Sequence, residues 1–117
     1  MDARVQAVVD LMESSYQREW SLEDLAQTIN LSPSYLSHLF KAEVGVSPTH
    51  YLKSIRMRKA KELMESTFLN VKQVMYSVGV RDKCHFARDF KNIYGMSPNA
   101  YRMRLRDPAA KAKSASE

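Results

Sequence analysis

The sequence predicts an all-α protein of about seven helices, organised as two helix-turn-helix subdomains that are joined by one basic helix. Three observations predict this fold class. A twelve-residue pattern occurs twice, apolar residues recur at helical spacing, and the charge changes sign along the chain. Helical spacing and uneven charge are common among α-helical proteins, so the internal repeat is the most specific of the three.

The repeat consists of two segments whose positions differ by fifty. Residues 40–51 read FKAEVGVSPTHY and residues 90–101 read FKNIYGMSPNAY, so six of the twelve positions are identical. In each copy a glycine follows an amphipathic run, which is where a left-handed residue commonly ends a helix. The Ser-Pro pair behind it supplies an N-cap and a proline at the first position of a new helix. Each copy therefore predicts the end of one helix and the start of the next.

Three helices are predicted before the first of these glycines. The first covers residues 4–16, and its apolar stripe consists of Val5, Val8, Val9 and Met12. The second begins at the cap Ser21, with Asp24 as a polar partner three residues on. Its apolar positions are Leu22, Leu25, Ala26 and Ile29. The third begins at the pair Ser32-Pro33 and is expected to bury Leu36, Leu39, Phe40 and Val44.

Four more helices are predicted after that glycine. A helix over residues 47–65 joins the subdomains, and its apolar positions are Leu52, Ile55, Ala60, Leu63 and Met64. The next begins at Asn70, with Gln73 as its polar partner, and its apolar positions are Val71, Val74, Met75 and Val78. The sixth begins behind a cap at Asp82 and is expected to bury Phe86, Phe90 and either Ile93 or Tyr94. A short last helix covers about residues 97–104.

These elements divide the chain into four parts. We expect a first subdomain over residues 1–46, the linker helix over 47–65 and a second subdomain over 66–106. The tail 107–117 has no periodic apolar face and is predicted to be disordered. Each subdomain contains two short helices joined by a turn, which is a helix-turn-helix of the homeodomain-like type. The starts of the two subdomains' first short helices are forty-nine residues apart, so the second turn is expected to contain one more residue.

Composition excludes several classes of protein. The chain is 44% hydrophobic and 26% charged, which is typical of globular proteins. No uncharged stretch approaches the ~18–20 residues that a membrane span needs, and no segment resembles a signal peptide. The single cysteine, Cys84, excludes an internal disulfide and fits a reducing compartment, so a cytoplasmic location is expected.

The charge is unevenly distributed. Residues 1–30 have a net charge of −4, whereas the remainder has a net charge of +9. This asymmetry indicates a surface beyond residue 30 that binds a polyanion. A solvated basic surface without a ligand is an equally good explanation of the charge alone.

The second helix of each pair has an outer face that suits the major groove of DNA. Small side chains near the helix start permit close approach, and longer donors one turn on can reach base edges. In the first subdomain the expected DNA-binding residues are Ser34, Ser37, His38 and Lys41. In the second they are Lys83, Cys84, Ala87, Arg88 and Lys91. Arg88 is the best candidate for a bidentate contact with guanine, and His38 stands at the equivalent position.

The spacing of the two pairs also fits double-stranded DNA. A linker of about 18 residues is about 27 Å long, and successive major grooves on one side of DNA are roughly 34 Å apart. Phosphate contacts are expected from Ser32, Tyr35, Arg58 and Lys59. For Tyr35 packing is the alternative. For the linker cations the alternative is a solvated helix with ion pairs such as Arg58–Glu62.

Nothing in the sequence indicates an enzyme, a cofactor or a metal site. Cys84 and His85 are adjacent on a helix and point in different directions, while His38 and His50 lack a second ligand at helical spacing. Gly-rich phosphate loops, nucleophile elbows and carboxylate pairs are absent. The alternative function is a helical module that binds an acidic protein through its basic face and has no specificity for DNA.

The residues resemble the DNA-binding domain of the AraC/XylS family of bacterial transcription regulators over roughly residues 21–104. The resemblance is carried by SLEDLAQTINLSPSYLSHLFKAEVGVSPTHYL, by RMRKAKELM and by VGVRDKCHFARDFKNIYGMSPNAYR. It implies seven helices with two helix-turn-helix units, binding to promoter DNA, and activation through contact with RNA polymerase. We expect an excised C-terminal domain rather than a stand-alone regulator, monomeric when isolated.

Two positions depart from the family pattern. The family favours a small residue where Met75 stands and an aromatic residue where Val80 follows Gly79. The large-for-small and small-for-large changes can compensate in volume. They nevertheless put in doubt the tilt of the second recognition helix, and with it the reach of Arg88.

Overall fold

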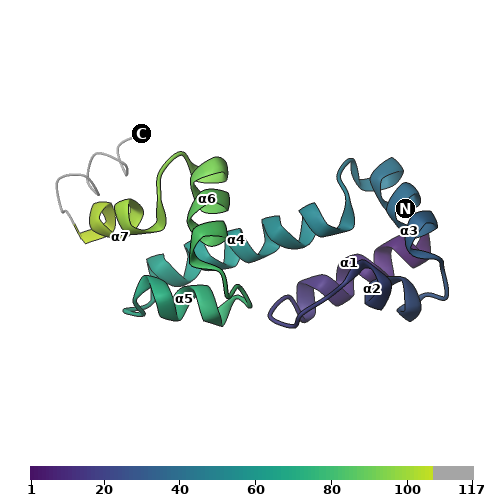
Figure 1. Cartoon of the computed structure of the whole chain (residues 1–117), viewed down its shortest axis with the longest axis horizontal. Coiled ribbons are helices and arrows are strands. Elements are labelled where there is room, and N and C mark those ends of the chain that lie inside the picture. The colour runs from purple at the N-terminus through teal and green to yellow at the C-terminus, as the bar shows by residue number, and fades with distance from the viewer. Residues whose placement is uncertain (107–117) are drawn as a thin grey trace. The chain divides into compact units, whose positions relative to one another are not determined.

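The computed structural model describes residues 1–106, and this part contains seven α-helices and no strand. The helices are α1 (Ala3–Ser14), α2 (Leu22–Thr28), α3 (Pro33–Val44), α4 (Pro48–Ser66), α5 (Val71–Ser77), α6 (Lys83–Tyr94) and α7 (Pro98–Arg106) (Figure 1). The all-α fold expected from the sequence is therefore confirmed. The tail predicted to be disordered, 107–117, lies outside the described residues.

The chain forms two compact units whose boundary falls inside α4. The first unit ends at Arg56 and the second begins at Met57. The predicted linker helix is α4, and it contributes its first half to one unit and its second half to the other. Each unit therefore consists of four helical segments: one leading segment, a helix-turn-helix pair and one closing segment.

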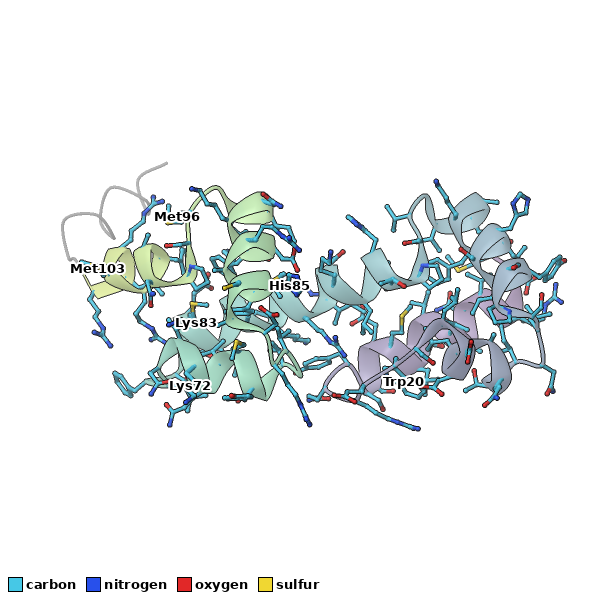
Figure 2. All side chains as sticks on the ribbon, viewed as in Figure 1. Trp20, Lys72, Lys83, His85, Met96 and Met103 are labelled. Atoms are coloured by element: carbon cyan, nitrogen blue, oxygen red, sulfur yellow. The ribbon has the colours of Figure 1, made fainter. Side chains whose placement is uncertain are left out.

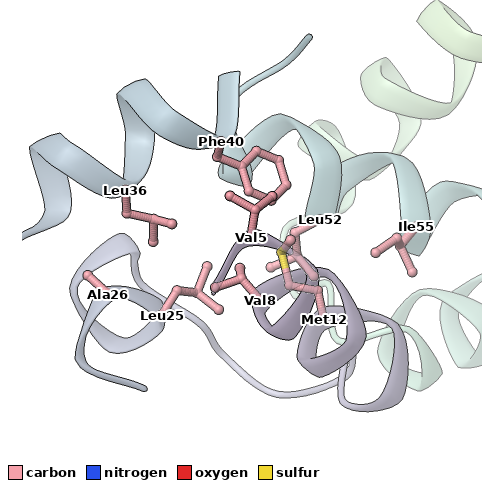
Figure 3. Close-up of a cluster of buried hydrophobic side chains, with 9 residues drawn as sticks. All are labelled: Val5, Val8, Met12, Leu25, Ala26, Leu36, Phe40, Leu52 and Ile55. Carbon is pink, nitrogen blue, oxygen red and sulfur yellow. The ribbon is translucent and has the colours of Figure 1, made fainter. Parts of the chain in front are cut away.

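The first unit is built around a continuous apolar core. α3 packs against both α1 and α2, and α4 closes the core (Figure 3). The buried members of this core are Val5, Val8, Met12, Leu25, Ala26, Leu36, Phe40, Leu52 and Ile55. All were expected to be apolar face positions, so the helical spacing located the core of this unit correctly.

The second unit buries the corresponding positions. Its core side chains are Met57, Ala60, Met64, Val74, Met75, Val78, Phe86 and Phe90. The first three take the places of Val5, Val8 and Met12 at an offset of fifty-two residues. The repeat therefore extends to the leading helix of each unit, at an offset that the twelve-residue pattern does not show. Met57 was missed for the same reason.

The predicted caps are present. Ser21 with Asp24, and Asn70 with Gln73, form reciprocal capping boxes at the starts of α2 and α5. Ser32 caps α3 and Asp82 caps α6, and each side chain accepts a hydrogen bond from a backbone N–H three residues on. These bonds satisfy N–H groups that a helix start leaves without a partner.

The turns of the two helix pairs differ by one residue, as expected. Four residues separate α2 from α3 and five separate α5 from α6. Both turns need a residue in the left-handed region, which is Asn30 (φ 56°) in the first and Gly79 (φ 84°) in the second. The extra residue lies after Gly79, where a longer connection leads to the cap at Asp82.

Some predicted core positions lie at the edge of the core. Leu39, Val44 and Leu63 are half-buried, because the stripe that faces the core of a short helix is narrower than its whole apolar face. Of the two alternatives at the end of α6, Ile93 is 47% exposed, whereas Tyr94 is half-buried with its ring centroid 4.8 Å from that of Phe90.

One contact explains why the repeat begins with phenylalanine and ends with tyrosine. In the first unit the ring of Phe40 meets that of Tyr51 edge-on at 5.6 Å, and the Tyr51 hydroxyl donates to a Glu13 carboxylate oxygen at 3.4 Å. The second unit repeats these contacts with the equivalent residues. The ring centroids of Phe90 and Tyr101 are 5.7 Å apart, and the Tyr101 hydroxyl donates to a carboxylate oxygen of Glu65. In both units this chain of contacts joins the second helix of the pair, α3 or α6, to the closing and leading segments.

An arginine also holds each unit closed. In the first unit Arg56 donates from Nε to the carbonyl of Tyr16 at 2.9 Å and from Nη2 to the carbonyl of Arg18 at 2.8 Å. Both carbonyls belong to the loop between α1 and α2. The guanidinium therefore fixes the loop that leads into the first helix pair.

In the second unit an arginine of α7 at a different position makes bonds of the same kind. Arg102 occupies the place of the buried Leu52, is only 9% exposed, and donates to the carbonyls of Met64 (3.2 Å), Thr67 (3.3 Å) and Leu69. These carbonyls lie at the end of α4 and in the loop before α5. Here a hydrogen-bonded guanidinium takes the position that an aliphatic side chain fills in the first unit.

We predict that Arg102→Ala lowers the free energy of unfolding by about 2–4 kcal/mol, because three carbonyl groups lose a charged donor and the core loses a buried stem. Arg106→Ala, at an exposed position of the same helix, is the matched control and should stay within about 0.5 kcal/mol of the wild type. Urea unfolding followed by circular dichroism measures both. Equal stability of the two variants would show that the Arg102 hydrogen bonds do not stabilise the fold.

Candidate nucleic-acid interface

The outer face of α3 carries the predicted first set of DNA-binding residues. Ser34, His38 and Lys41 are exposed and Ser37 is half-buried. Leu36 and Phe40 are buried on the opposite face. The four predicted residues recur at three- and four-residue intervals, so they share one face of the helix. They also line one shallow groove beside the start of α2. The structure therefore brings the whole predicted set together.

The outer face of α6 carries the second set in the same arrangement. Cys84, Arg88 and Lys91 are exposed and Ala87 is half-buried, at the positions equivalent to those of α3. The Arg88 side chain is 61% exposed, and its Nε lies 3.8 Å from a carboxylate oxygen of the neighbouring Asp89. A contact this long and exposed is a weak one, so the guanidinium remains available to a ligand.

Lys83, the remaining member of the second set, lies at the start of α6. Figure 2 shows Lys83 and His85 on different sides of the first turn of this helix, as two residues separated by about 200° must be. Lys83 lines a groove that also contains the basic residues Lys72 and Arg81 and the apolar residues Val71 and Met75. The surface beside α6 is thus more basic than the surface beside α3.

The candidate phosphate contacts of the first unit lie at the start of α3. The Ser32 hydroxyl accepts from the backbone N–H of Tyr35 at 3.2 Å, so its own proton is free to be donated. Tyr35 is 48% exposed, and the guanidinium carbon of Arg4 lies 5.7 Å from its ring centroid. Arg4 therefore stands beside the recognition helix, although no sequence pattern on α1 pointed to it. It also pairs with Asp2, at 2.9 Å between Nη2 and Oδ2.

The candidate phosphate contacts on α4 are Arg58 and Lys59, which differ in exposure. Arg58 is exposed. The Lys59 ammonium lies 3.6 Å from a carboxylate oxygen of Glu62, with about a third of the lysine side chain accessible. A partly exposed pair of this length contributes little to stability.

An acidic side chain caps the second recognition helix. The Asp82 carboxylate accepts from the backbone N–H of His85 at 2.9 Å, and this bond lowers the pKa of Asp82 below its usual value. The His85 Nδ1 lies 3.4 Å from the same carboxylate. Asp82 is therefore ionised at neutral pH, and it places a negative charge where free N–H groups would otherwise attract phosphate.

Among the described residues, no three His, Cys, Asp or Glu side chains are grouped in a way that could hold a metal ion. No helix in this part of the chain is both long and apolar enough to span a membrane. The features of this part of the chain that could bind a ligand are therefore the exposed faces of α3 and α6.

Comparison with known proteins identifies the family of this chain. A family model described as "Helix-turn-helix domain" matches residues 25–104, from within α2 into α7. The chain belongs to the AraC/XylS family. Its fold and its relatives are those of transcription-regulator DNA-binding domains rather than of enzymes.

Two curated relatives illustrate the similarity. The chain is 34% identical over 98 residues to the lactose operon transcription activator of Staphylococcus xylosus, covering 84% of this chain and 35% of the relative. It is 35% identical over 106 residues to the arabinose operon regulatory protein of Salmonella typhimurium, covering 87% of this chain and 37% of the relative. The chain thus spans a little over a third of the length of these relatives.

Solved structures share the fold. The C-terminal domain of AraT, a response regulator from Geobacillus stearothermophilus, has a TM-score of 0.82 at 36% identity, covering 87% of this chain and 85% of that one. The DNA-binding domain of AdpA, a global transcriptional factor solved in complex with a target DNA, has a TM-score of 0.83 at 26% identity, covering 90% and 96%.

Met75, the large residue at a position where the family favours a small one, is accommodated inside the core. It is 4% exposed, and the equivalent Ala26 of the first unit is 1% exposed. Val80 is half-buried, and its backbone N–H donates to the Met75 carbonyl at 3.1 Å. The second helix pair therefore keeps the hydrogen bond that the first makes between Leu31 and Ala26.

We predict that Asp82→Asn tightens DNA binding about two- to fivefold at low salt, because Asn caps a helix as well as Asp while the negative charge is removed. Fluorescence anisotropy at pH 7 and two salt concentrations measures the change. Asp82→Ala removes cap and charge together and should lower the melting temperature as well. Unchanged affinity of Asp82→Asn would place the start of α6 away from phosphate.

The stabilities of the wild type and of Asp82→Asn should depend differently on pH. The folded-state pKa of Asp82 is lowered, so its capping stabilises the protein above the unfolded-state pKa and is lost as the pH falls through the folded-state value. The asparagine does not titrate. Asp82→Asn should therefore gain stability relative to the wild type on acidification, which thermal unfolding between neutral and acidic pH measures.

Proposed function

We propose that this domain binds double-stranded DNA sequence-specifically by inserting α3 and α6 into adjacent major grooves, and that it regulates transcription by activation. The observation that carries the proposal is the duplication of one exposed helix face, with the same caps and the same outward positions on α3 and α6. Such a pair allows a single chain to contact two half-sites, which otherwise requires a dimer. The relative solved with target DNA supports the assignment.

The two recognition helices have different tasks in this proposal. Arg88 on α6 makes a bidentate contact with guanine, and the equivalent His38 on α3 makes a weaker polar contact. Lys41 and Lys91, one turn further on, meet phosphates together with the contacts expected from α4 and the start of α3. The second half-site therefore contributes more of the electrostatic affinity.

Further partners follow from the family. An activator of this kind recruits RNA polymerase, and the names of relatives such as the lactose operon transcription activator favour activation over repression. We propose a cytoplasmic protein whose isolated DNA-binding domain is monomeric, because each half-site is met by a different part of one chain rather than by a second copy.

The test is selection from a random duplex library, followed by titration of the selected and a scrambled duplex at two salt concentrations. The proposal expects a preference for the selected sequence that survives the higher salt, with a slope of log Kd against log salt that reports several phosphates. Equal affinity for both duplexes, or no binding near physiological salt, would favour a basic module that binds an acidic protein.

We predict that Arg88→Ala costs about 1–3 kcal/mol of binding and relaxes the preference at one position of one half-site. Lys59→Ala should weaken binding to all sequences about equally and reduce the salt slope by about one. Both are measured on the selected duplex and on its single-base variants. If Arg88→Ala keeps the wild-type preference at every position, Arg88 does not contact a base.

A further inference from the structure

The groove beside α3 has an apolar part that the polar contacts proposed above do not use. Its polar lining is the face that carries Ser34, Ser37 and His38. The same groove is also lined by Leu22 from the start of α2 and by Pro33 from the start of α3, with Ala42 one turn beyond His38. Leu22 and Pro33 are half-buried, so each offers part of its side chain to the groove.

The groove beside α6 in the second unit is more basic. The position of Pro33 is taken by Lys83, and the groove beside it is lined by the basic residues Lys72 and Arg81. Leu22 is replaced there by the smaller Val71. The groove of the second unit also has apolar lining, from Val71, Met75, Tyr76 and Phe86, but it carries three lysine or arginine side chains where the groove of the first unit carries one, Lys41.

The major groove offers one kind of apolar group to such a surface. Base edges there present donors and acceptors, and the exception is the C5-methyl group of thymine. A 5-methylcytosine carries a methyl group on the same ring carbon. The small Ser34 and Ser37 let the helix come close to base edges, and exposed Lys41 at the same groove supplies the positive charge that a neighbouring phosphate requires.

We propose that the groove formed by Leu22, Pro33 and the outer face of α3 binds a pyrimidine C5-methyl group in the half-site contacted by the first unit. The inference rests on the proposed function, because it assigns part of the specificity of the same DNA-binding surface. It makes the two half-sites chemically unlike: the first is selected by an apolar contact and the second by a charged donor.

The test replaces methyl groups one at a time in the selected duplex. Each thymine is changed to uracil, which keeps the pairing edge and lacks the C5-methyl group. Loss of one buried methyl should weaken binding about three- to fivefold at one or two positions of the first half-site. In a second arm, each cytosine of that half-site is changed to 5-methylcytosine.

The two arms separate the sources of the methyl group. Uracil sensitivity identifies thymine as the natural ligand, and tighter binding with 5-methylcytosine alone identifies the methylated base. Selective binding that responds to neither substitution in the first half-site overturns the inference while leaving the proposed function intact. Failure to prefer any sequence overturns the proposed function itself.

A variant pair locates the methyl contact in the groove. Leu22→Ala removes one wall, so the ratio of thymine to uracil affinity should fall towards one, whereas Val71→Ala at the equivalent position of the second unit should leave that ratio unchanged. The ratio compares two duplexes on one protein, so it is insensitive to the fraction of folded protein. An unchanged ratio in Leu22→Ala would place the methyl contact elsewhere and overturn the assignment of the groove.

Discussion

The orientation of each recognition helix depends on one aromatic side chain that ties it to the rest of its unit. Phe40 packs edge-on against Tyr51, and the hydroxyl of Tyr51 reaches Glu13 on the leading helix. A chain of two contacts thus connects α3 to the closing and leading segments. Because aromatic pairs have preferred geometries, the contact constrains rotation of the helix as well as its distance from the core. With Leu36 and Phe40 buried, Ser34 and His38 lie on the exposed face of α3.

The small size of each unit explains why α4 is shared. About fifty residues bury a core of eight or nine side chains, and domains of that size are marginally stable. Neither unit can omit its share of α4, because Leu52 and Ile55 close the first core while Met57, Ala60 and Met64 line the second. The helix is therefore a structural component of both cores as well as a connection between them, and substitutions on its buried face affect DNA binding through folding.

The two halves have diverged on both sides of their recognition helices. On the buried side, Leu52 of the first unit corresponds to Arg102 of the second, whose two terminal guanidinium nitrogens donate to carbonyl groups. On the exposed side, His38 corresponds to Arg88 and Pro33 to Lys83. A duplicated scaffold with unlike outer faces is suited to an asymmetric DNA site, since each half can be selected for a different base without altering the shared fold.

The sequence by itself determined the number of helices, their caps and both sets of outward-facing residues. These are local properties, because a capping box, a Gly stop and a helical stripe are each decided within a few residues of the chain. Only the tertiary structure showed that α4 divides between Arg56 and Met57, that Arg102 occupies a core position, and that Leu22 and His38 line one groove. Each of these depends on contacts between segments that are far apart in sequence, which periodicity does not encode. The half-buried state of Leu39 and Val44 has the same origin, since the width of a buried stripe is decided by the helices that pack against it.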